Sequence, residues 1–256
     1  AYPPTTTSTP QPKPAVLSPV EEFYADYDQG VEEVLFISHN LPNSAAVERW
    51  RRDLENLKPY LQPELPQLKG KTIHVVLQAH DEGDAQLQDP EVVASQAEIL
   101  NVLNKLKPKL LTIEGSYMDR FSRESFVAEM NTTLSEVLET FGGERKADPN
   151  DLYDQYLSRN AVLRYAHDHP ECHTIGGEWR GVHVLDLVMR LPGAPPAAQQ
   201  SAQNRTESRI RSWMTAARIG EFMRRDFQSE GTIVIGRNHR SDFELLEKLF
   251  GVKVVF

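Results

Sequence analysis

Four metal-capable or titratable side chains stand at the ends of short apolar runs that lie far apart in this sequence. They are His80, Glu114, Glu178 and His239. Imidazole and carboxylate groups together suit a divalent metal such as Zn, Mn, Co or Fe. An open position on such an ion would supply a hydrolytic nucleophile, and a carboxylate outside the metal shell could act as a general base if burial raised its pKa. Without a metal, His80 and a nearby glutamate could still form an acid/base pair.

The apolar runs that lead to these side chains read as buried strands. The expected strands are Ile73–Leu77, Leu110–Ile113, residues 173–176 and residues 232–236, with a last strand over residues 252–256. Continuous apolar strands that alternate with helices predict an α/β fold, with a mostly parallel β-sheet flanked by helices on both faces. Ligands of such sheets bind outside the carboxyl ends of the strands. The four side chains are therefore expected to share one edge of the sheet, whatever the strand order.

Helical spacing and cap residues predict the elements between the strands. The expected helices cover residues 18–27, 90–107, 121–141, 149–168, 182–191, 197–228 and 241–250, and a further helix carries Val47, Trp50, Leu54 and Leu57. The segment Val31–Ser38 is expected to be an edge strand. Pro59, Pro63 and Pro66 are expected to enforce a non-helical connection up to Gly70.

Length and composition predict one domain of soluble type. Residues 18–256 form a single α/β domain, in which residues 18–70 supply N-terminal helices and the edge strand, and residues 71–256 hold the core and the site. Residues 1–17 are rich in Pro and Thr and predict a flexible tail. Such a tether fits a secreted, periplasmic or envelope-anchored protein, although an ordinary tail on a cytoplasmic protein fits the sequence equally.

Charge and cysteine content exclude several classes of function. The net charge of −9 argues against a nucleic-acid partner, because phosphate neutralisation requires clustered Lys and Arg. No apolar run approaches the roughly 20 residues needed for a membrane span. The single cysteine, Cys172, excludes an internal disulfide and a CxxC metal site. Oligomeric state is left open.

Three motifs, taken in order, resemble a known group of proteins. The strand end Gln78-Ala-His80, the strand end Ile113-Glu114-Gly115 and the turn Gly236-Arg-Asn-His239 are similar to those of the erythromycin esterase/ChaN/TraB/Tiki group. The segment Arg209–Ile219 resembles the helix that precedes the last motif in that group. The chain departs from the pattern at Leu77, where glycine is usual, and at Ser212, where asparagine is usual.

The resemblance implies an α/β fold with a site at the carboxyl edge of the sheet. It implies that the two motif histidines, His80 and His239, the strand-end Glu114 and the helix Arg211 belong to that site. We expect His80, His239 and Glu114 to bind a metal or act as acid and base, with Arg211 and the strand-end Glu178 assisting catalysis. The group includes metal-dependent peptidases, esterase-like enzymes and a haem-binding lipoprotein. The first hypothesis is therefore a metal-dependent hydrolase of peptides or small-molecule esters. The alternatives are a haem- or iron-binding protein without catalysis, and a non-catalytic interaction protein on the same fold.

Structural explanations compete at several positions. Glu178 could simply begin the next helix, where an acid suits the dipole, and Arg211 could be one of several surface charges on its helix. The dense run from His167 to His173 is more typical of a helix end than of a metal site. Cys172 enters a strand and is expected to be a buried apolar residue. Trp179, Trp213 and Tyr117 could line an apolar pocket or pack in the core.

Overall fold

The computed structural model describes residues 16–79, 89–145, 147–190 and 206–256. The predicted tail therefore lies almost entirely outside the described residues, as does His80. The described chain folds around a five-stranded sheet with the order β3-β2-β4-β1-β5, in which every neighbouring pair is parallel. The predicted α/β fold with a parallel sheet is confirmed.

The register of the sheet brings the strand ends level with one another. The strands are β1 (Thr72–Gln78), β2 (Leu110–Ile113), β3 (His173–Gly176), β4 (Glu230–Gly236) and β5 (Lys253–Val255). Gln78 of β1 pairs with Gly236 of β4, and Ile113 of β2 pairs with Gly176 of β3. The residues that follow these four positions therefore emerge at one edge of the sheet, which we call the carboxyl edge.

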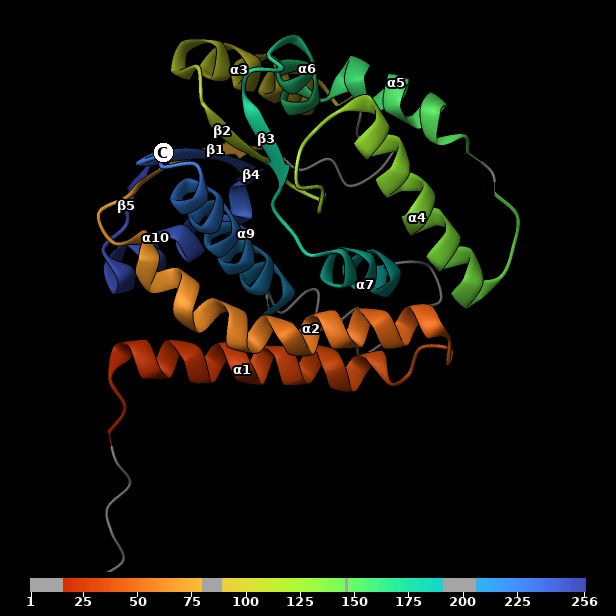
Figure 1. Ribbon diagram of the computed structural model, residues 1–256, viewed down its shortest axis with the longest axis horizontal. Helices are drawn as coiled ribbons and strands as arrows, with labels where there is room; N and C mark the ends of the chain where they lie inside the picture. Colours follow the sequence, from red (N-terminus) through yellow and green to blue (C-terminus); the bar gives the residue numbers. More distant parts are fainter. Residues whose placement is uncertain (1–15, 80–88, 146, 191–205) are drawn as a thin grey trace, which may run out of the picture.

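Helices cover both faces of the sheet. They are α1 (Pro19–Ser38), α2 (Ala45–Glu64), α3 (Pro90–Leu106), α4 (Arg123–Phe141), α5 (Pro149–Arg159), α6 (Ala161–Asp168), α7 (Arg180–Arg190), α9 (Thr206–Arg225) and α10 (Arg240–Phe250), with 3-10 turns η1 (Leu65–Leu68) and η3 (Arg237–His239). Figure 1 shows α3 and α6 on one side of the sheet, and α9 on the other side with α2 and α1 beyond it.

The core divides into two layers because successive strand residues point to opposite faces. In β4, Ile233 and Ile235 join the core packed under α1, α2 and α9, whereas Val234 joins the core under α3 and α6. In β2, Leu110 belongs to the first layer and Leu111 to the second. Both faces of the sheet are therefore buried, as its continuous apolar strands require.

The segment Val31–Ser38 is helical, so the predicted edge strand is wrong there. α1 continues beyond residue 27, where the sequence predicts its end, and includes Gly30. A glycine costs a helix interior about 1 kcal/mol. Buried side chains on both sides of it recur every three or four residues, which is the period of one helix face. They are Phe23, Tyr27, Val31, Val34 and Leu35. Burial of this stripe against α2 and α9 outweighs the cost of the glycine.

The predicted non-helical connection after residue 58 is also wrong over most of its length. α2 contains both Pro59 and Pro63, and η1 follows it directly. A proline inside a helix costs about 3 kcal/mol, but burying one leucine side chain contributes about 1.5–3 kcal/mol. Leu57, Leu61 and Leu65 are fully buried and continue the helical stripe. Figure 1 shows α2 beside α1 and then bending away in its second half.

The remaining helices agree with prediction apart from their limits. The stretch 149–168 is two helices, because Asn160 ends α5 and its side chain caps α6 through Leu163 N. α9 is described from Thr206, and the earlier part of the predicted helix 197–228 lies outside the described residues. Among the helices described, none is both long and apolar enough to cross a membrane.

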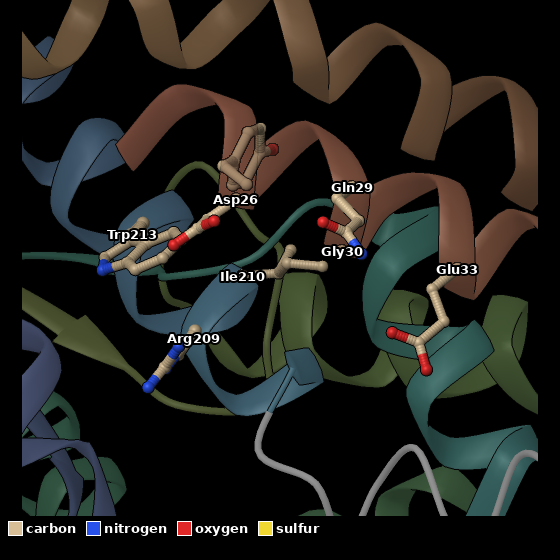
Figure 2. A pocket seen from close by; sticks show the side chains of 8 residues that line it. Asp26, Gln29, Gly30, Glu33, Arg209, Ile210 and Trp213 are labelled. Carbon is tan, nitrogen blue, oxygen red and sulfur yellow. The ribbon is translucent and has the colours of Figure 1, made fainter. Parts of the chain in front are cut away.

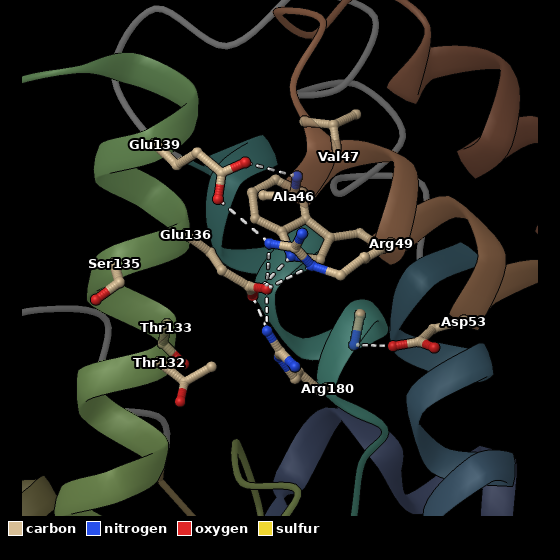
Figure 3. A network of polar contacts seen from close by, with 12 residues as sticks. Ala46, Val47, Arg49, Asp53, Thr132, Thr133, Ser135, Glu136, Glu139 and Arg180 are labelled. Atoms are coloured by element: carbon tan, nitrogen blue, oxygen red, sulfur yellow. Dashed lines mark hydrogen bonds and ion pairs between the residues drawn. The ribbon is translucent and has the colours of Figure 1, made fainter.

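A buried carboxylate fixes α4 against α2 and α7. Glu136 of α4 accepts hydrogen bonds from Arg49 Nε at 3.2 Å and from Trp50 Nε1 at 2.9 Å, both from α2. Arg180 of α7 pairs with the same carboxylate. Figure 3 shows Arg49 and Arg180 converging on Glu136, with Glu139 one turn further along α4. Two arginines and an indole thus satisfy a carboxylate that is only 4% exposed, which makes its burial acceptable.

Candidate functional site

Three of the four predicted strand-end side chains meet at the carboxyl edge. Glu114 follows β2, Glu178 follows β3, and His239 closes η3 after β4. Arg211 reaches them from α9: its Nη2 lies 2.6 Å from Glu178 Oε1 and 3.6 Å from Glu114 Oε1. His80 lies outside the described residues, so its position at this edge stays a prediction.

The Glu114 carboxylate is held in one orientation by neighbours from β1 and β4. Its Oε2 accepts hydrogen bonds from Gln78 Nε2 and from Gly236 N, each at 3.0 Å. The Gln78 amide is oriented in turn, because its Oε1 accepts from Gln96 Nε2 at 3.2 Å. The other carboxylate oxygen, Oε1, lies 3.6 Å from His239 Nε2. One oxygen of Glu114 is thus used to position the group, and the other is directed at the imidazole.

The His239 imidazole is oriented by a serine and an aspartate. Ser212 Oγ lies 2.6 Å from His239 Nδ1 and donates to Asp242 Oδ2 at 2.7 Å. Because an ionised carboxylate only accepts, the serine proton points at Asp242, and the serine oxygen is left to accept from Nδ1–H. The proton therefore resides on Nδ1, and in the neutral ring the Nε2 lone pair faces Glu114. All three side chains are buried.

Arg211 and Glu178 form a buried ion pair. Arg211 Nε and Nη2 both donate to Glu178 Oε1, at 2.9 and 2.6 Å, and Gly115 N donates to the same oxygen at 3.1 Å. Burial alone would raise the pKa of the Glu178 carboxyl, but the Arg211 charge and the nearby His183 imidazole lower it well below its usual range. A carboxylate held ionised in this way is a weak base. The contacts favour a role for Glu178 in positioning Arg211 and the turn after β2.

That turn is held tightly against β3. Gly115 has a φ of 71°, in the left-handed region that favours glycine. A side-chain carbon on Gly176 would lie 2.4 Å from the backbone of Ser116, so only glycine allows this approach. Arg218 of α9 bridges the turn and β3, because its Nε donates to Gly176 O at 2.7 Å and its Nη2 donates to Tyr117 O at 3.0 Å.

Four residues of this region were not identified by strand-end reasoning. They are Ser212, Asp242, Glu129 and His183. Asp242 could have been predicted from the sequence. It follows His239 by three residues at the start of a helix, and this spacing places both side chains on the same side of the helix. Ser212 is fully buried among mostly apolar residues of α9, and a buried hydroxyl needs a polar partner.

Carboxylates predominate among the buried charged side chains of the region. Glu114 and Asp242 lie beside the His239 imidazole, and Arg211 links Glu114 to Glu178. Arg209, which is half exposed, lies 3.8 Å from Asp242.

His239 Nε2 and Glu114 Oε1 fit a divalent ion in kind and in spacing. An imidazole nitrogen and a carboxylate oxygen are common zinc ligands, and two ligands at about 2.0–2.1 Å on a tetrahedral ion are roughly 3.3 Å apart. The observed separation is 3.6 Å. A complete set needs one or two further ligands, and the described residues contain no group of three or more His, Cys, Asp and Glu side chains arranged to hold a metal. His80 is the predicted additional ligand.

The other candidate groups have separate structural partners. His169 contacts Glu171 and His173 contacts Asp226, while His167 Nδ1 meets the Tyr153 hydroxyl at 3.1 Å. Burial raises the pKa of the Cys172 thiol, which suits a structural cysteine.

Aromatic side chains near the site serve mainly in packing. Trp213 packs on Phe23 with ring centroids 4.3 Å apart, and Trp179 packs on Tyr60 at 4.6 Å. Tyr117 lies beside His183 at 5.9 Å. Both tryptophans therefore pack on aromatic neighbours, and Trp213 also lines a polar pocket between α1 and α9.

A polar pocket lies between α1 and α9, and Glu114 is not among its lining residues. Figure 2 shows Asp26, Gln29 and Glu33 of α1 on one side of it and Arg209 with Ile210 of α9 on the other. Its lining contains none of the predicted strand-end residues. The chemistry of the molecule is therefore better sought at the carboxyl edge.

Comparison of the chain with protein-family models, with curated proteins and with solved structures gives no match. The resemblance to the erythromycin esterase/ChaN/TraB/Tiki group thus rests on the sequence motifs alone.

Proposed function

We propose that this protein is a metal-dependent hydrolase of peptide or ester bonds, with its centre at His239 and Glu114. The observation that carries the proposal is the chain of contacts from Asp242 through Ser212 to His239, which directs Nε2 of the imidazole at Glu114 Oε1. A histidine whose second nitrogen is fixed by a polar partner is the usual arrangement of a metal ligand.

The residues of the chain have separate tasks in this proposal. His239 and Glu114 would hold the ion, with His80 as the expected third ligand. Such an ion polarises a carbonyl and lowers the pKa of bound water. Asp242 and Ser212 keep the Nδ1 proton in place, so that Nε2 stays available. Arg211 contacts both Glu114 and Glu178, which holds the two glutamates at a fixed separation.

The side chains at the centre support a cation over an acid/base pair without metal. The carboxylates of Glu114 and Asp242 lie beside the His239 imidazole, and carboxylate and imidazole groups are common ligands of divalent ions. The carboxyl end of a parallel sheet is also where ligands of such folds bind.

Metal content is the direct test. The protein would be purified without chelator and analysed by inductively coupled plasma mass spectrometry, beside His239→Ala, Glu114→Gln and His169→Ala. His169 is the matched control, because it pairs with Glu171 outside the site. We expect near-stoichiometric metal in the wild type and the control, loss in the two site variants, and metal-dependent cleavage within a panel of peptides and esters.

The same metal analysis can also contradict the proposal. No metal in any of the four proteins after soaking with Zn, Mn and Co would overturn the proposal. A Soret band on addition of haem in that case would favour the haem-binding alternative, and its absence would leave an interaction protein on the same fold.

A further inference from the structure

Two buried glutamates on α4 have opposite surroundings. Glu129 and Glu136 lie seven residues apart, which is two helical turns on the same face. Both are less than 5% exposed. Glu136 is paired with Arg49 and Arg180 (Figure 3), whereas no Arg or Lys within the described residues forms an ion pair with Glu129.

The two carboxylate oxygens of Glu129 differ in their contacts. Its Oε2 accepts from Ser116 Oγ at 3.1 Å and from Tyr117 N at 3.0 Å. Its Oε1 is buried and has no hydrogen-bond partner among the described residues. The backbone carbonyl of Glu129 also accepts from the Tyr117 hydroxyl at 3.2 Å. The helix is thereby attached to the turn that follows Glu114.

The charged and titratable groups around Glu129 do not compensate an anion. Glu178, after β3, is itself ionised against Arg211, and its Oε2 lies 3.4 Å from His183 Nδ1 of α7. Tyr117 approaches from the turn after β2 as a neutral phenol, since burial raises its pKa to about 12. Arg180 of α7 is already engaged by Glu136. An isolated buried carboxylate is far more costly than a neutral carboxylic acid.

We propose that Glu129 carries a proton and acts as a positioning residue, fixing the turn Gly115–Tyr117 from α4 while Glu178 fixes it from β3. The role of this turn in presenting Glu114 to an ion rests on the proposed function, whereas the protonation of Glu129 does not. Consistent with this assignment, burial and the Glu178 charge raise the pKa of Glu129, and the contacts from Tyr117, His183 and Ser116 only partly offset that effect.

The proposal predicts that the stability of the protein falls as the pH rises. A carboxyl whose pKa is raised by folding loses its stabilising contribution as the pH rises through the folded pKa. Above that pH a second negative charge appears beside Glu178, and the hold of α4 on the turn weakens. The stability of the protein and the order of the turn should both decline toward alkaline pH, and the decline should disappear when Glu129 cannot ionise.

Glu129→Gln is the decisive variant, because glutamine has the shape of the protonated acid and can still accept from Ser116 and Tyr117. Melting temperatures would be measured from pH 5 to pH 9 for the full chain. We expect the variant to match the wild type at pH 5 and to exceed it by roughly 2–4 °C at pH 9. Glu136→Gln is the matched control and should melt lower at every pH, because it removes the charge that two arginines contact.

An infrared measurement separates a proton from a merely structural role. The wild type should show the carbonyl band of a protonated carboxyl group at neutral pH, and Glu129→Gln should lack that band. Glu129→Ala should melt lower than both at pH 5, since it removes the acceptor of Ser116 and Tyr117.

Two outcomes would overturn the proposal. One is a lower melting temperature of Glu129→Gln throughout the pH range, which would show that the charge is needed. The other is the absence of a band that the variant removes. Metal analysis of the same samples keeps the two proposals distinct, because a protein without metal can still show the Glu129-dependent pH profile, and a metal-loaded protein can lack it.

Discussion

Ser212 Oγ lies 2.6 Å from His239 Nδ1, and this contact decides which nitrogen of the imidazole faces the carboxyl edge. The two residues come from different elements, α9 and η3, and are 27 positions apart. Because the serine donates its proton to Asp242, it can only accept from the histidine. The hydroxyl thus performs the orienting role that His239 would need as the proposed metal ligand.

Ser212→Ala should separate the orientation of His239 from its presence. Loss of the hydroxyl removes the oxygen that accepts from Nδ1 and one donor to Asp242, so metal affinity or hydrolytic activity should fall about 10–100-fold. Stability should fall by about 1–3 kcal/mol. Equilibrium metal titration and urea denaturation measure the two effects. Asp242→Asn keeps an acceptor for Ser212 and should lose less affinity; equal affinities of Ser212→Ala and the wild type would show that this contact has no role in binding.

The Glu178–Arg211 pair predicts a specific acid sensitivity. Folding lowers the pKa of Glu178 from its usual value of 4.5. A carboxyl of this kind stabilises the protein above its unfolded pKa, and the contribution is lost as the pH falls toward the folded value. Glu178→Gln should therefore be less stable than the wild type at pH 7, because Arg211 loses its nearest counter-ion, and the difference should shrink below about pH 4.5.

Denaturant unfolding of both proteins at a series of pH values between about 2 and 7 tests this prediction. Glu171→Gln serves as the control, because that side chain is exposed beside His169. A difference between Glu178→Gln and the wild type that stays constant across the series would contradict an electrostatic origin.

Replacing Gly176 or Gly70 by alanine should reduce the free energy of unfolding by different amounts. In Gly176→Ala the new methyl group would lie 2.4 Å from the backbone of Ser116, which cannot move without displacing the turn. We expect a loss of about 3 kcal/mol or more. In Gly70→Ala the methyl group meets nothing within 4 Å, and only the φ of 74° is unfavourable, at about 1–2 kcal/mol. Thermal unfolding of both variants measures the contrast, and equal losses would show that contact with Ser116 is not the limiting factor.

The sequence predicts the meeting of Glu114, Glu178 and His239 because parallel strands end at the same edge. That inference needs only the position of each residue after its strand, and no knowledge of strand order. The order itself is not encoded in the apolar pattern: β4, a late strand, lies between β1 and β2.

Helix-borne residues are harder to foresee for a physical reason. A polar residue on a helix reaches the site only if the helix is rotated and placed correctly over the sheet, and sequence periodicity specifies an apolar face without its neighbours. Ser212 and Glu129 depend on such placement. The prediction of a strand over Val31–Ser38 was wrong for a related reason. The apolar pattern of this segment suits a strand locally, and only the continuation of the buried α1 stripe across Gly30 identifies it as helix.

Phe227 occupies a backbone conformation that favours glycine, and its replacement should stabilise the protein. Its φ is 55°, and it follows α9 at the position where a helix usually ends on glycine, with Gln228 N donating to Met223 O at 2.7 Å. Its side chain is 94% exposed, so little packing is lost on removal. Phe227→Gly should therefore raise the free energy of unfolding by about 0.5–1 kcal/mol, as left-handed strain is relieved. Urea denaturation measures this gain, and Phe227→Ala, which keeps the strain, should show none. A loss of stability in Phe227→Gly would instead indicate that the exposed ring is covered in solution.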